Sequence, residues 1–244
     1  MLKTNRKTPL AGARVAMAIF ILVSQCLVAQ DPNLQQKGAQ IKEAMAANKQ
    51  ALCHYTWQEQ QTVSLKGEVK KQQLFQVQNG PDGKPQKTLV GPPPEQQEPS
   101  GGRLKRHVVE KKKEEFKDYA QQIAELAQSY AQPEPGRLQQ AFAQGNAMLG
   151  SGGAPGEIKL VIHNYVKPND TVTMTFNSAN KAVQSLQIAS YLNDPKDAVN
   201  ITAQFARLPD GTNHVANMLV NGVSKELTVN IENSNYQKLS GMQG

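Results

Sequence analysis

Apolar and polar residues alternate along the last third of the chain, from Glu157 to Ile231. A period of two residues is typical of strands with one buried face. Short segments rich in Pro, Asp, Asn and Gly separate the alternating segments, so we expect neighbouring strands to pair antiparallel. The apolar members of the segments are Ile158, Leu160 and Ile162; Val172, Met174 and Phe176; Leu186, Ile188 and Leu192; Val199, Ile201, Ala203 and Phe205; part of His214–Val220; and Leu227, Val229 and Ile231.

A shorter alternating unit precedes this one, between residues 54 and 90. Its first segment has an apolar side and a polar side, which is typical of a half-buried strand. Two turns follow, Lys66-Gly67 and residues 79–83, because glycine reaches the positive φ that tight turns require. They predict a three-stranded meander whose apolar side carries Tyr55, Trp57, Val63 and Leu65, then Val69, Phe75 and Val77, then part of Lys87–Val90.

Three segments have helical periodicity. Asn33–Leu52 and Leu104–Tyr130 carry apolar residues three and four positions apart. Pro133-Glu134-Pro135 ends the second helix and predicts a third over residues 135–149. Residues 91–102 are rich in Pro and Gly and predict an exposed loop, and the Gly-rich residues 150–156 predict a flexible linker into the main sheet.

These elements predict one α+β domain over residues 30–240. We expect a curved antiparallel sheet of about eight or nine strands, an incomplete barrel, covered on one face by the three helices. Residues 241–244 are expected to form a disordered tail.

Residues 1–29 have the layout of a secretory signal. Four basic residues lead into an unbroken apolar run, Val15–Val23, and Leu27-Val28-Ala29 offers a small residue for cleavage. The apolar run is shorter than the roughly 18 residues of a membrane span, so we expect an exported protein, periplasmic or extracellular, with no transmembrane span after cleavage. Removing four basic and no acidic residues lowers the formal net charge from +7 to +3, which argues against nucleic acid as a partner.

The chain offers little for catalysis or metal binding. Cys53 is the one cysteine after cleavage, so no internal disulfide is expected, and its interpretation as a small buried hydrophobe is favoured over a thiolate activated by His54. Cys26 as a lipidation site is disfavoured because Gln25 precedes it. The four histidines lack the spacing of a zinc site, and no G-x-S-x-G motif occurs. Glu59, a single carboxylate, is interpreted as an edge residue that reaches solvent. We expect no catalytic residues, metal or cofactor, and no enzyme activity.

The apolar face of the sheet is the main candidate for function. If the helices cover it loosely, they leave a lidded pocket for a lipid or acyl chain, and if they cover it closely, they form an ordinary core. The residues expected to line the wall are Trp57, Phe75, Met174, Phe176, Leu186, Ile188 and Phe205. The residues expected on the helical lid are Phe116, Tyr119, Ile123 and Phe142.

The order of elements resembles the LolA/LolB-like superfamily of periplasmic lipoprotein carriers and outer-membrane receptors. The resemblance lies in the export signal, an N-terminal helix, a meander opening Tyr55-Thr56-Trp57, a helical excursion, and a longer meander closing with Thr228-Val229-Asn230. It implies an unclosed barrel that binds acyl chains under a helical lid, gated in the soluble carrier by a buried arginine. The strand at 54–65 contains no arginine, and Arg207 is the remaining candidate.

Two functional hypotheses follow from these observations. The first is an envelope carrier or binding protein for an apolar ligand, whose partner is a lipid or a lipoprotein acyl chain. The second is a non-enzymatic structural or interaction protein of the envelope, with a solid core and an envelope protein as its partner. The space between the helices and the sheet separates the two, since a carrier needs room there.

Overall fold

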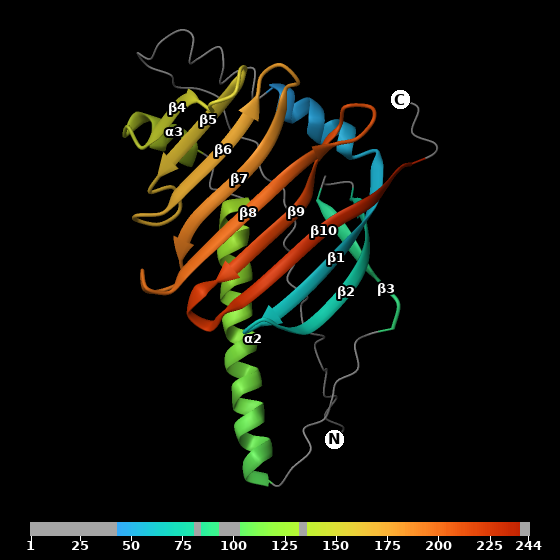
Figure 1. Ribbon diagram of the computed structural model, residues 1–244, viewed down its shortest axis with the longest axis vertical. Coiled ribbons are helices and arrows are strands. Elements are labelled where there is room, and N and C mark those ends of the chain that lie inside the picture. The colour runs from blue at the N-terminus through green and yellow to red at the C-terminus, as the bar shows by residue number, and fades with distance from the viewer. Residues whose placement is uncertain (1–42, 81–83, 93–102, 132–135, 240–244) are drawn as a thin grey trace, which may run out of the picture.

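The computed structural model describes residues 43–80, 84–92, 103–131 and 136–239. Within them, ten strands form one open antiparallel sheet in the order β3-β2-β1-β10-β9-β8-β7-β6-β5-β4 (Figure 1). The strands are β1 (Tyr55–Leu65), β2 (Glu68–Asn79), β3 (Pro85–Val90), β4 (Ala147–Ser151), β5 (Glu157–His163), β6 (Thr171–Asn177), β7 (Ala182–Tyr191), β8 (Ala198–Arg207), β9 (Asn213–Gly222) and β10 (Leu227–Lys238). The helices are residues 43–52, α2 (Arg103–Ala131), α3 (Arg137–Ala143) and the 3-10 turn η1 (Val223–Lys225).

The two predicted meanders form a single sheet because β1 pairs with β10. The register runs from Tyr55 opposite Lys238 to Leu65 opposite Leu227. The α+β class and the open antiparallel sheet with three helices are therefore confirmed, with ten strands in place of eight or nine. The predicted signal at 1–29, residues 33–42 of the first helix, residues 93–102 of the predicted loop and the tail at 241–244 lie outside the described residues.

The prediction of a helix over 135–149 is wrong in its second half. α3 ends at Ala143, and Gly145 then takes a φ of 73°, a left-handed conformation that glycine adopts without steric cost. The next residues form β4, which pairs with β5 and leaves Met148 54% exposed. The predicted linker at 150–156 is also corrected, because its first two residues end β4 and the rest form the β4–β5 hairpin turn, closed by a hydrogen bond from Gly152 N to Glu157 O.

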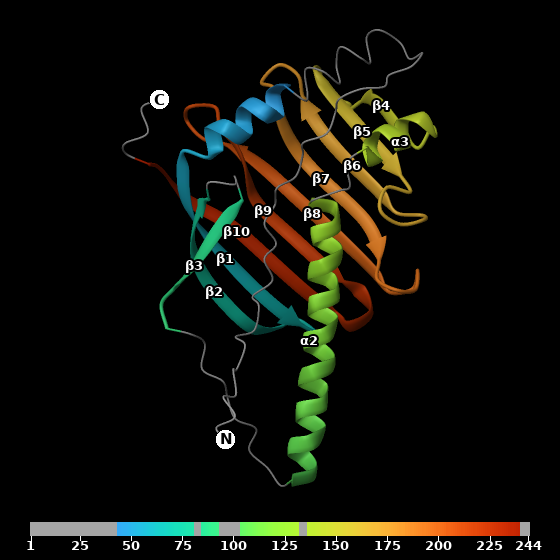
Figure 2. The ribbon, with the colours of Figure 1, turned by 180° about the vertical axis from the view of Figure 1, so that it is seen from behind.

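The helices lie on one face of the sheet, which we call the inner face. Figure 2 shows α2 crossing this face and α3 beside β4 and β5. The helix at 43–52 is tied to the start of β9, where the Asn48 side chain donates to Asn213 O and accepts from Asn213 N. The first half of α2 extends past the sheet (Figure 1), and residues 110–115 are exposed there.

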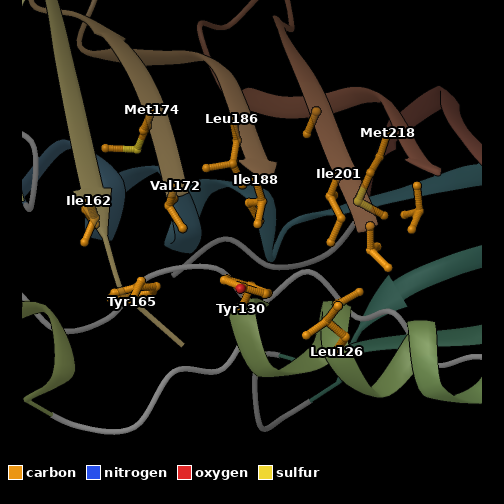
Figure 3. Close-up of a cluster of buried hydrophobic side chains, with 14 of the residues drawn as sticks. Leu126, Tyr130, Ile162, Tyr165, Val172, Met174, Leu186, Ile188, Ile201 and Met218 are labelled. Atoms are coloured by element: carbon orange, nitrogen blue, oxygen red, sulfur yellow. The ribbon is translucent and has the colours of Figure 1, made fainter. Parts of the chain in front are cut away.

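The core lies between the second half of α2, α3 and strands β4 to β10. The stripe of α2 that enters it has the three- and four-residue spacing expected of an amphipathic helix. Figure 3 shows Leu126 and Tyr130 of α2 facing side chains that point down from the sheet. The stripe consists of Tyr119, Ile123, Leu126, Ala127 and Tyr130, each at most 6% exposed.

Tyrosine hydroxyls fasten both ends of this stripe. The Tyr119 hydroxyl lies 3.1 Å from Asp197 Oδ1 and 3.0 Å from Ser224 Oγ. The Tyr130 hydroxyl donates to Asp170 Oδ2 at 2.6 Å and lies 2.7 Å from Ser190 Oγ. These contacts satisfy polar groups that would otherwise be costly to bury, and they fix α2 against the β5–β6, β7–β8 and β9–β10 connections, which lie at the same end of the strands.

Asp170 in turn fixes the loop between β5 and β6. It is fully buried, and its carboxylate accepts hydrogen bonds from the backbone N–H groups of Tyr165, Val166 and Lys167. A carboxylate with this many donors holds a loop in one conformation. Tyr130 therefore contacts a rigid acceptor rather than a mobile one.

Alkaline pH should weaken this attachment. Burial, together with the hydrogen bond to Asp170, raises the pKa of Tyr130 above its usual value near 10. A raised folded-state pKa leaves the contribution to stability intact below about pH 10 and removes it as the pH rises further, by up to about 1.4 kcal/mol per pH unit for one tyrosine. Urea unfolding at several pH values should show Tyr130→Phe with a shallower alkaline decline than the wild type.

Ser190→Ala is the matched control for this experiment. It removes the other hydroxyl of the contact without removing the titrating group, so it should lower stability at neutral pH and keep the wild-type alkaline slope. If the stability of the wild type and of Tyr130→Phe declined equally with rising pH, Tyr130 would not be the group responsible for the decline.

Candidate functional site

The inner face of the sheet changes from apolar to polar where β10 meets β1. Residues paired across antiparallel strands point to the same face, so the register traces rows across the sheet. One row is apolar until it reaches β2: Ile162, Val172, Ile188, Ile201, Val220, Val229, Val63 and then Lys71. The neighbouring row turns polar one strand earlier: Leu160, Met174, Leu186, Ala203, Met218, Ile231, then Gln61 and Gln73.

The polar end of the inner face contains a buried ion pair. Lys87 of β3 forms a salt bridge with Glu59 of β1, and the two side chains are only 12% and 7% exposed. Gln61 Nε2 donates to Glu59 Oε1 at 2.5 Å. Phe75 of β2 lies opposite Glu59 in the register. The sequence-based interpretation of Glu59 as an edge residue reaching solvent is therefore wrong, because β2 and β3 place a counter-charge over it.

Aromatic rings lie beside this ion pair. Trp57 stacks on Tyr236 of β10 with ring centres 5.5 Å apart and planes 13° apart, and its indole N–H donates to Asn233 Oδ1. The His214 ring centre is 4.2 Å from that of Tyr236. Burial and the charge of Glu59 raise the pKa of Tyr236, whereas burial lowers the pKa of His214. Both rings are therefore held neutral near pH 7.

Lys71 is the cation that ends the long apolar row. It lies opposite Val63 in the register, and it is half-buried, like Gln73 and Phe75 farther along β2. It forms no hydrogen bond or ion pair with any described residue, whereas its neighbour Lys70 forms an exposed pair with Glu68. Loss of hydration lowers the pKa of Lys71. This position therefore offers a positive charge at the edge of an apolar surface.

Val63 and Val229 lie at the transition between the core and the polar end, and we call them, together with Phe116 of α2, the boundary residues. Each is half-buried and packs against the core cluster. Val63 and Val229 are the apolar residues nearest to Lys71 in the strand register, whereas Phe116 belongs to α2. An apolar group placed against them would be removed from water without displacing the fully buried core.

The residues expected to line the wall separate into two groups. Met174, Phe176, Leu186 and Ile188 are 1–4% exposed and lie in the core cluster with α2, and Phe205 packs partly buried against it. Trp57 is buried and Phe75 half-buried at the polar end of the inner face.

The residues predicted for the lid belong to α2 and α3. Tyr119 and Ile123 are buried against the sheet, while Phe116 and Phe142 are half-buried beside the core cluster. In this arrangement the helices cover the sheet closely where α2 crosses it.

The pattern of apolar residues did not reveal Lys71, Gln61, Lys87 or Tyr236. Lys71 and Gln61 look solvent-exposed in sequence, and only strand pairing places them on the inner face. The alternation places Lys87 in the third strand, but it does not indicate that its partner is Glu59, 28 residues away.

Two single residues also differ from expectation. Arg207 is exposed at the end of β8, where its Nε donates to Gly211 O, so it is not a buried gating arginine. Cys53 is half-buried in the turn before β1 rather than fully buried in a strand. Neither residue contributes to the inner face described above.

Within the described residues, no group of three or more His, Cys, Asp or Glu side chains is placed to hold a metal ion. None of the helices in the same residues is long and apolar enough to cross a membrane.

Comparisons with known proteins add little to this geometry. No model of a protein family matches the chain, and no curated protein matches it. Among solved structures, the chain is similar to one described as a LolA superfamily protein from Nitrosomonas europaea, with 9% sequence identity and a TM-score of 0.39, over 84% of this chain and 94% of that chain. At this level of similarity, function has to be inferred from the inner face itself.

Proposed function

We propose that this protein is an exported binding or carrier protein for an amphiphilic ligand, a lipid or another acyl-chain compound. The apolar part of the ligand lies against the boundary residues Val63, Val229 and Phe116, and its polar end lies over β1 and β2. The secretory layout of residues 1–29 supports export.

The observation that carries the proposal is the change of polarity along each row of the inner face. A face that served only as a core would be apolar wherever it is covered, because buried polar groups are costly. Here the same rows continue from Val229 and Ile231 into Val63 and Gln61, and then into Lys71 and Gln73. An amphiphilic ligand has its apolar and polar parts in the same order as the side chains along these rows.

α2 acts as the lid in this proposal. Its second half is fastened by the hydroxyls of Tyr119 and Tyr130, each of which holds a loop rather than a strand centre. A hydrogen bond of this kind contributes about 0.5–1.5 kcal/mol net, and releasing one end of α2 also exposes buried side chains of its apolar stripe, so the ligand has to replace that apolar contact. A longer acyl chain would gain contact with the core in this way.

A structural or interaction protein with a solid core is the second candidate function. It is favoured by the direct contact of α2 with the sheet, where Ile123 and Tyr119 lie over Gly222. In this case the inner face takes no ligand, and an envelope protein is the partner.

Ligand binding distinguishes the two candidates. We expect the wild type to bind a fluorescent fatty acid saturably, and a charge at the boundary, as in Val63→Asp, to weaken binding at least tenfold, or about 1.4 kcal/mol, because the acyl chain would lose apolar contact and meet a carboxylate. Fluorescence titration measures the affinity, and mass spectrometry of protein purified from its native envelope identifies any bound lipid.

Leu219→Asp is the matched control, because Leu219 is an exposed apolar residue that pairs with Thr202 and Asn230 on the opposite face of the sheet. It should bind like the wild type, and circular dichroism should show both variants folded. Absence of bound lipid together with absence of fatty-acid uptake would refute the carrier and favour the solid-core protein.

A further inference from the structure

Building on the proposed lipid-binding function, we infer that the ligand carries an anionic head group and that Lys71 on β2 contacts it. The position of Lys71 in the sheet, its lack of a partner among the described residues, and the pairing of the other charges nearby support this contact.

Lys71 lies close to the apolar boundary residues. Lys71 follows Val229 and Val63 in one row, on three adjacent strands. Strands lie about 4.8 Å apart, so Lys71 is about 10 Å along the face from Val229. An acyl chain that begins at the boundary residues and crosses β1 therefore places its head group within reach of the lysine ammonium.

Lys71 also lacks a counter-ion among the described residues. Lys71 forms no ion pair or hydrogen bond with a described residue, although it is half-buried. A cation in this environment is partly dehydrated without compensation, and its lowered pKa has burial as its cause. A carboxylate or phosphate at this point would supply the missing charge and accept a charge-assisted hydrogen bond.

The charges around Lys71 disfavour a cationic head group. Glu59 is the carboxylate on the inner face of β1, and it is already paired with Lys87 and accepts from Gln61. A cationic ligand would have to displace Lys87 and would face Lys71 as a like charge, which disfavours it. The unpaired charge at this end of the face is therefore positive, and it selects an anion.

The test compares ligands that share one acyl chain and differ in their head group. Dodecanoate, dodecanol and dodecyltrimethylammonium compete with a fluorescent fatty acid for the wild type, for Lys71→Met and for Lys70→Met. Lys70 is the matched control, because it is the adjacent lysine, exposed and paired with Glu68. Methionine is unbranched and only one atom shorter than lysine, and it removes the charge.

We expect the wild type to bind dodecanoate about tenfold more tightly than dodecanol, a typical value for one charge-assisted contact. Lys71→Met should lose this preference and keep its affinity for dodecanol, and Lys70→Met should keep the preference. Increasing salt should reduce the preference of the wild type but leave dodecanol binding unchanged.

Each outcome separates the inference from the function on which it rests. Equal binding of the three ligands by the wild type would refute the anionic head group and leave the lipid-binding function in place. A preference that survives Lys71→Met would refute the role of this lysine, and tighter binding of dodecyltrimethylammonium would indicate Glu59 as the contact. Failure of all three ligands to compete, with no binding of the fluorescent acid, would refute the proposed function.

Discussion

Replacing Gly222 with valine is expected to lower the free energy of unfolding by about 3 kcal/mol and to loosen α2, because a well-packed core cannot accept added carbon atoms without strain. Gly222 lies at the end of β9 directly under α2. A Cβ atom there would lie 2.4 Å from Ile123 Cδ1 and 2.8 Å from the Tyr119 hydroxyl. Its backbone is extended, with φ −91° and ψ 101°, so the strain comes from the contact with α2 and not from the main chain.

Urea unfolding measures the loss of stability, and amide hydrogen exchange measures the opening of α2. Gly150→Val in β4 is the matched control, since no atom lies within 4 Å of a Cβ at that strand position, and it should change stability by less than about 0.5 kcal/mol. In the smaller variant Gly222→Ala, adding Ile123→Val should restore part of the lost stability, because valine lacks the Cδ1 atom that collides. Wild-type protection of the α2 amides in Gly222→Val would show that α2 does not press on the sheet.

The strands of this fold could be predicted because their alternation is local. Val172, Met174 and Phe176 alternate with three threonines, and β6 spans that segment. β4 could not be predicted because Ala147–Ser151 has no alternation, and its strand conformation follows from pairing with β5 rather than from its own composition. The apolar residues of α3 and the exposed Met148 happen to share a helical spacing, and the conformation of Gly145 is what separates them.

The wall and the lid residues could be identified as apolar from the sequence. The separation of the wall residues into a core group and a group at the polar end could not be predicted. It depends on where α2 crosses the sheet, and that crossing needs the missing side chain of Gly222, which is not recognisable as a contact site in sequence. The polar end depends on the pairing of β1 with β10, which joins residues more than 160 positions apart. From the sequence of β2 alone, Lys71 is indistinguishable from a solvent-exposed lysine.

Replacing Lys87 with methionine is expected to cost about 3–5 kcal/mol of stability, the largest single effect we anticipate. Glu59 would then be a buried carboxylate without a counter-charge, and its remaining donor, Gln61, is uncharged. Breaking a buried ion pair on one side is far more costly than removing the whole pair, because the desolvation of the remaining charge is no longer offset. The Lys87→Met variant should therefore unfold at a much lower urea concentration than the wild type.

The double variant Glu59→Gln/Lys87→Met separates the charge from the packing. Glutamine keeps the shape of Glu59 and can still accept from Gln61, so the double variant should regain most of the stability lost by Lys87→Met. Lys70→Met is the control for loss of a lysine, because its pair with Glu68 is exposed and should contribute less than about 1 kcal/mol. If the double variant were as unstable as Lys87→Met alone, the methylene packing of Lys87 would be the stabilising element, and the ion pair would contribute little to the polar end of the inner face.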